Sequence, residues 1–120
     1  MKRIVTMREI KFQILFEVHN RDFTTRITSH YTTLERLTTG GDNFDYSAVK
    51  IIAKSQFTGL QDKNGVDIYE GDVVNAEYNY LGYTEVKFLN GKFNICDLST
   101  SMCVVIGNIY QNPELINNNL

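Results

Sequence analysis

Two segments of the sequence concentrate carboxylates, and each suggests a different chemistry. Asp62–Asp67 has the residue types of a calcium-binding loop, but that loop needs glycine at its sixth position, and here glycine is fourth. We therefore predict a turn in which Asp62 bonds its own backbone. Glu70 and Asp72 flank Gly71 and suggest an acid–base pair. Because no histidine adjoins them, we expect both to be solvated in a second turn.

The residue types that bind zinc are present but dispersed. They are His19, His30, Cys96 and Cys103, and their spacing puts no two of them on one turn. We predict no metal site and no disulfide framework, with Cys96 as a small core or rim residue. The sequence also contains no nucleophile elbow, phosphate-binding loop or dinucleotide glycine pattern. We therefore expect no enzyme, no catalytic residue and no cofactor.

The elements that would position a site are strands in the first part of the chain. Lys11–Val18 alternates between apolar and polar residues, which predicts a half-buried strand. Its apolar face comprises Phe12, Ile14, Phe16 and Val18, with Leu15 as the exception. Thr24–Thr33 is rich in β-branched residues and predicts another strand or a sheet edge.

A short helix and an ambiguous segment follow. Thr32–Arg36 could start a short helix, which Gly40-Gly41 would end. Residues 46–57 fit either a helix capped by Asp45 or Ser47, or a strand, and we favour the strand.

The second part of the sequence predicts short strands joined by tight turns. Asn90-Gly91 is the strongest hairpin signal, because both residues tolerate the positive φ of a type I′ turn. A two-residue loop places Phe88 opposite Phe93, and Val86 opposite Ile95. We expect a mainly β fold, with an N-terminal β-rich extension over residues 1–54. Residues 55–120 would form a small SH3-like antiparallel barrel with a short C-terminal tail.

Charge is unevenly distributed along the chain. Residues 1–36 hold seven cations and four acids, a net charge of +3, whereas residues 55–120 hold three cations and eight acids, a net charge of −5. These regions either form two solvated faces or attract each other, within one chain or between copies. No apolar run approaches the roughly 20 residues that span a bilayer. The acidic and basic residues Glu9 and Lys11 interrupt any signal-peptide core, so we expect a cytoplasmic protein that does not bind membranes.

Three segments resemble a known family. Gln56–Gly65 with Asp67–Val74 resembles the signature of the YopX proteins of phages and prophages, Val105–Leu115 resembles their closing segment, and Met7–Phe12 resembles their start. The sequence departs from the family where Gln13-Ile14-Leu15-Phe16 replaces an arginine and a Trp-Asp turn. The resemblance implies an intracellular, mostly β protein encoded by a phage or prophage, whose function is undetermined.

Together these observations predict a non-enzymatic accessory protein that forms a homo-oligomer in the bacterial host, with a phage or host protein as a further partner. The alternative is a nucleic-acid-binding module that uses the basic N-terminal half. That alternative needs one face carrying both arginines and aromatic rings. The arginines would be Arg3, Arg8, Arg21, Arg26 and Arg36, and the nearby rings are only Phe12 and Phe23. We therefore expect no binding to nucleic acid.

Overall fold

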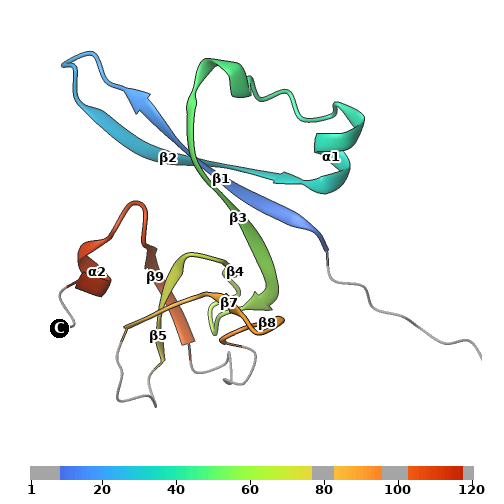
Figure 1. Cartoon of the computed structure of the whole chain (residues 1–120), viewed down its shortest axis with the longest axis vertical. Coiled ribbons are helices and arrows are strands. Elements are labelled where there is room, and N and C mark those ends of the chain that lie inside the picture. The colour runs from blue at the N-terminus through green and yellow to red at the C-terminus, as the bar shows by residue number, and fades with distance from the viewer. Residues whose placement is uncertain (1–8, 77–82, 96–102, 118–120) are drawn as a thin grey trace, which may run out of the picture.

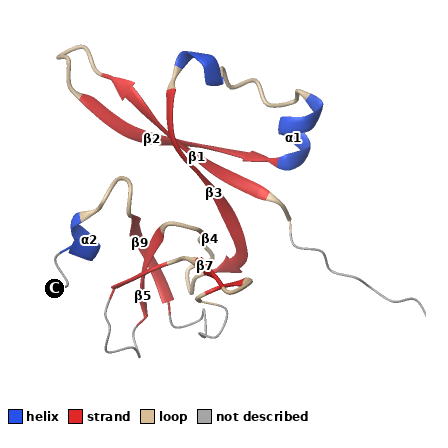
Figure 2. Ribbon diagram, in the orientation of Figure 1, coloured by secondary structure: helices blue, strands red, loops and turns tan. Residues whose placement is uncertain are grey.

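The computed structural model describes residues 9–76, 83–95 and 103–117. These residues form two β-rich halves joined by one long strand, which runs through the middle of the view (Figure 1). Four of the strands form one sheet in the order β2-β1-β3-β4, three form a second sheet in the order β6-β5-β9, and β7 pairs with β8. The fold is mainly β, as the sequence predicts (Figure 2).

The N-terminal half begins with a long hairpin. β1 (Lys11–His19) pairs with β2 (Thr25–Thr33) over nine residues without a shift in register. The predicted helix follows as α1 (Leu34–Thr39). It begins there because the Thr33 side chain accepts a hydrogen bond from the Arg36 N–H, and it ends at Gly40, whose φ is +78°.

The prediction of a half-buried β1 is wrong at the centre of the strand, where both faces are buried. Phe16 packs against Phe44 from the connection after α1, with ring centroids 5.0 Å apart. On the opposite face Gln13 and Leu15 are also buried. Gln13 lines a cavity that residues of the C-terminal half complete. The apolar face that includes Phe16 is therefore covered by the chain itself.

The strand predicted within residues 46–57 is confirmed, although it begins and ends four residues later. A short 3-10 helix, η1 (Tyr46–Ala48), precedes β3 (Lys50–Gln61). β3 pairs with β1 through residues 50–56 and with β4 (Asp67–Tyr69) at residues 57 and 61. The boundary at residues 54 and 55 thus lies inside one continuous strand.

The C-terminal half contains the remaining elements. These are β5 (Asp72–Ala76), β6 (Tyr83–Glu85), β7 (Phe88–Leu89), β8 (Lys92–Phe93), β9 (Cys103–Asn108) and α2 (Glu114–Asn117). Within the ranges that the structure describes, these strands form a separate sheet and a hairpin, and no pairing closes them into an SH3-like barrel. One reason is that β3, expected to contribute to that barrel, is paired along half its length with β1.

The Asn90-Gly91 hairpin has the predicted register. Phe88 lies opposite Phe93, and both turn residues have positive φ, +53° at Asn90 and +81° at Gly91. Phe93 is buried, but Phe88 is 51% exposed, so the expected apolar face is only partly covered. The buried cluster of this half comprises Ile68, Val74, Val86, Phe93 and Ile95.

Two glycines with positive φ allow a matched test of this half. Gly71 has a φ of +87°, and a Cβ added there would lie 2.9 Å from Cε2 of Tyr110, whereas a Cβ at Gly91 would meet open space. We predict that Gly91→Ala lowers the free energy of unfolding by about 1–2 kcal/mol from backbone strain alone. Gly71→Ala should cost about 2–5 kcal/mol because overpacking adds to the same strain. Urea denaturation measures both, and equal losses would contradict the contact with Tyr110.

Candidate functional site

The Asp62 carboxylate joins two distant segments of the chain. Its Oδ1 accepts hydrogen bonds from the N–H groups of Asn64 (2.8 Å) and Val66 (3.0 Å), and its Oδ2 accepts one from the N–H of Val105 in β9 (2.9 Å). Burial tends to raise the pKa of Asp62, but these three donors outweigh it and lower the pKa. The predicted turn is therefore confirmed, and it also holds β9.

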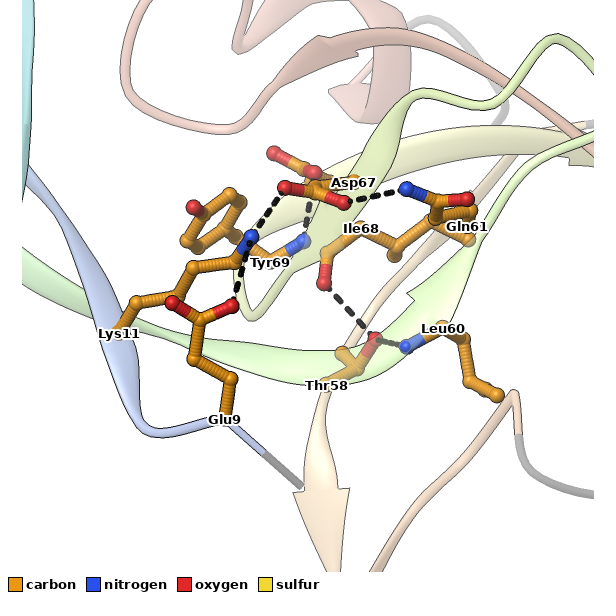
Figure 3. Close-up of polar contacts among 9 residues, drawn as sticks. Glu9, Lys11, Thr58, Leu60, Gln61, Asp67, Ile68 and Tyr69 are labelled. Carbon is orange, nitrogen blue, oxygen red and sulfur yellow. Dashed lines mark hydrogen bonds and ion pairs between the residues drawn. The ribbon is translucent and has the colours of Figure 1, made fainter. Parts of the chain in front are cut away.

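An ion pair joins the start of β1 to β4. Lys11 Nζ lies 2.6 Å from Asp67 Oδ2 and 3.7 Å from Glu9 Oε2 (Figure 3). It also lies 4.3 Å from the centre of the Phe57 ring. Gln61 Nε2 donates to the other oxygen of Asp67 at 2.9 Å. The hydrogen bond with Asp67 raises the pKa of Lys11. Burial opposes ionisation of Asp67, but the bond from Lys11 outweighs it and lowers the pKa of Asp67.

A third contact joins the turn at Gly71 to the segment after β9. The N–H of Ile109 donates to the Gly71 carbonyl at 2.9 Å, and the Tyr110 ring lies over Gly71. The Asn108 side chain accepts bonds from the N–H groups of Tyr110 and Gln111, which shapes that turn. The start, signature and closing segments of the sequence therefore meet in one region of the fold.

The solvent exposure of the Asp72 side chain differs from the sequence prediction. It was expected to be solvated, but it is only 5% exposed, because it begins β5 beside the buried Tyr69 and Val73. Its Oδ2 accepts one hydrogen bond, from the N–H of Tyr69 at 2.8 Å. Burial raises the pKa of Asp72 to about 7, and that single bond offsets it only in part. Glu70 is half-buried and does not share this environment.

Asp72 lines a polar cavity between the two halves. The cavity has a volume of about 160 Å³ and is also lined by Gln13, Ser29, Tyr31 and Asn108. Tyr31 and Tyr69, whose ring centroids are 5.6 Å apart, also line a neighbouring groove of about 420 Å³. With a pKa near 7, Asp72 can accept or donate a hydrogen bond there. The site can thus hold ordered water or a small polar group. The sequence signal that could have indicated this burial is the adjacent pair Val73 and Val74, because two successive apolar residues in a strand put an apolar side chain on each face.

Comparison with known proteins identifies the family. A family model described as YopX protein matches residues 2–117, nearly the whole chain. The chain belongs to the YopX family. No curated protein matches it. Among solved structures, this YopX chain is similar to the crystal structure of protein EF1440 from Enterococcus faecalis, with 23% sequence identity and a TM-score of 0.47. That similarity covers 89% of the YopX chain and 97% of the other chain.

The zinc-binding residue types are not brought together in the YopX chain. His30 Nε2 lies 2.9 Å from Asp42 Oδ1, and the Phe44 ring stacks on the His30 ring at 4.4 Å. His19 is exposed at the far end of β1, Cys103 is buried in β9, and Cys96 lies outside the described residues. Within the part of the chain that the structure describes, no three His, Cys, Asp or Glu side chains could hold a metal ion.

The contacts of Asp42 instead hold the connection between α1 and β3 over the sheet. Asp42 accepts hydrogen bonds from the Tyr46 hydroxyl and from the Phe44 N–H. Burial tends to raise the pKa of Asp42, but its hydrogen bonds hold that pKa well below the usual range. No helix among the described residues of the YopX chain is long and apolar enough to cross a membrane.

The two neighbouring carboxylates, Asp72 and Asp67, should respond oppositely to substitution. Because the pKa of Asp72 is raised in the folded state, the unfolded state releases its proton first, and stability falls as pH rises from about 4 to about 7. Asp72→Asn keeps an acceptor for Tyr69 but removes this titration. We predict that its stability relative to the wild type improves by roughly 1–3 kcal/mol between pH 5 and pH 8.

Asp67→Asn is the control for this measurement. Since the pKa of Asp67 is lowered by Lys11, its ionised form stabilises the fold at both pH values. This variant should therefore lose stability at pH 5 and at pH 8 alike. Urea denaturation at the two pH values measures both variants, and a pH-independent effect of Asp72→Asn would contradict a raised pKa.

Proposed function

We propose that this YopX protein is a non-enzymatic accessory protein of a phage or prophage that acts by binding proteins, first of all copies of itself, in the cytoplasm of the bacterial host. The observation that supports this most directly is the tip of the β1–β2 hairpin. There, Phe23 is 96% exposed. Aromatic side chains are enriched in protein–protein interfaces relative to the rest of the surface, so this ring is a candidate contact residue.

The apolar face of β1 no longer supports self-association, because Phe44 covers it from within the same chain. Contacts between copies must therefore use other surfaces. Besides Phe23, exposed apolar side chains occur on β6 and β7, where Tyr83 is 39% exposed and Leu89 is 53% exposed. These two regions lie in different halves of the chain.

The nucleic-acid alternative gains no comparable support. Lys11 is paired with Asp67, and Lys50 lies 3.8 Å from Glu17. Arg26 is the second residue of β2, and Arg36 lies in α1 beyond the other end of that strand. The strand from Arg26 to Thr33 alone spans about 23 Å. Arg3 lies outside the described residues, as does Arg8. The described cations thus do not form the concentrated face that phosphate binding requires.

We predict that the purified protein self-associates. Its average mass by light scattering after size exclusion should exceed that of one chain and should rise with concentration. Lowering the ionic strength should favour association if oppositely charged regions meet. A single-chain mass at every concentration up to several hundred micromolar would contradict the proposal.

We also predict weak binding to nucleic acid. Fluorescence anisotropy with short single-stranded and double-stranded DNA at about 150 mM salt should show affinities weaker than micromolar. Micromolar or tighter binding, with a steep dependence on salt, would favour the alternative function.

A further inference from the structure

We propose that the tip of the β1–β2 hairpin in one copy of the chain inserts Phe23 into the groove between β6, β7 and α2 of a second copy. The inference rests on the proposed self-association and names its two surfaces. It follows from the backbone strain at the tip, from the apolar lining of the groove and from the charges around both.

The tip is ordered by its own hydrogen bonds. The N–H of Asn20 donates to the Thr24 carbonyl at 2.8 Å, and the N–H of Phe23 donates to the Asn20 carbonyl at 3.1 Å. Asp22 Oδ1 accepts bonds from both the N–H and the hydroxyl of Thr24. Among the described residues, no contact of the Phe23 ring with another ring or cation is found. The backbone is thus held in place while the side chain projects into solvent.

Phe23 stands where glycine would be favoured. Its φ is +68°, in the left-handed region, and hairpin loops of this kind usually place glycine there. A bulky residue in this region is strained. Strained backbone of this kind is found preferentially at functional sites, where the geometry serves binding. The tip is therefore strained at the residue whose aromatic ring is 96% exposed.

The groove in the C-terminal half fits an aromatic ring. It has a volume of about 430 Å³, and its apolar lining comes from Tyr83, Leu89 and Ile116. Tyr83 and Leu89 are both substantially exposed. The volume lies within the range of sites that bury small ligands. A phenyl ring seated there would cover apolar surface that is open to solvent in the single chain.

The charges beside the two surfaces are complementary. At the tip the cations Arg21 and Arg26 outnumber the one acid, Asp22. Arg26 Nε donates to Asn20 Oδ1 at 3.3 Å, whereas within the described ranges Arg21 forms no hydrogen bond or ion pair. Glu85 lines the groove, and Glu114 lies in the first turn of α2, which packs against β6, while Lys87 is the one cation in the lining. The net charges of the larger regions have the same signs, +3 over residues 1–36 and −5 over residues 55–120. Such complementarity orients and accelerates association.

The two surfaces are different, so the contact is head-to-tail. In Figure 1 the hairpin tip lies at the upper edge of the molecule, and β7 lies in the lower half, so a chain cannot reach its own groove. Each copy offers one tip and one groove. Repetition of this contact produces a closed ring or an open filament.

Phe23→Gly separates binding from folding. Glycine adopts the left-handed region without strain, so the melting temperature should stay the same or rise. Self-association should weaken at least tenfold, since the ring that fills the groove is gone. Phe23→Tyr keeps a ring of similar shape and should retain association.

Leu89→Glu tests the groove at an exposed position. This variant should also be monomeric at concentrations where the wild type associates. Mixing Leu89→Glu with Phe23→Gly should produce a 1:1 heterodimer, because Leu89→Glu has an intact tip and Phe23→Gly has an intact groove. The heterodimer should not grow further, since its remaining tip and groove are the altered ones. Analytical ultracentrifugation of each variant and of the mixture measures this.

The outcomes distinguish the inference from the proposed function. If the wild type associates and Phe23→Gly associates equally well, the tip is not the contact and this inference fails, while self-association stands. If Phe23→Gly is monomeric but Leu89→Glu associates like the wild type, the ring docks elsewhere and the groove is wrong. If both variants are monomeric and their mixture is monomeric too, the contact does not join a tip to a groove and the inference fails. A wild type that is monomeric at every concentration overturns self-association itself.

Discussion

β3 is the constraint on which the arrangement of both halves depends. One end of this twelve-residue strand pairs with β1, and the other end pairs with β4. This strand therefore links the two halves through backbone hydrogen bonds at both of its ends. Further contacts reinforce the connection, including the Lys11–Asp67 ion pair and a hydrogen bond from Gln111 Nε2 to the Ile27 carbonyl at 2.8 Å. The two halves therefore form one structural unit.

Two buried carboxylates show how the same group acquires opposite properties in neighbouring turns. Asp62 accepts three backbone N–H bonds, and its pKa is lowered, whereas Asp72 accepts one, and its pKa is raised to about 7. Burial disfavours the charge in both cases, but Asp72 is the more deeply buried and has fewer donors, and Lys63 also favours the charge on Asp62. Asp62 thus serves as a fixed anionic link between segments. Asp72 is left as a titrating group in the cavity between the halves.

Some apolar side chains of the described residues are covered by other side chains of the chain, whereas others are exposed to solvent. The aromatic residues Phe16, Phe44 and Tyr46 cover one another over the sheet. Phe23, by contrast, is held outward by a loop whose hydrogen bonds leave its backbone in the left-handed region. The chain belongs to the YopX family. The surfaces that this chain exposes, rather than its family, are the basis for the function proposed.

Local sequence determined the strands, the α1 cap and the Asn90-Gly91 register, because propensity, capping and turn chemistry act over a few residues. The turn at Asp62 was predictable for the same reason. Only the tertiary structure decided that β1 is buried on both faces, that β3 crosses the expected boundary and that Asp72 is desolvated. Each of these depends on segments distant in sequence. Periodicity reports which face of an element is apolar, but it does not report what packs against the other face.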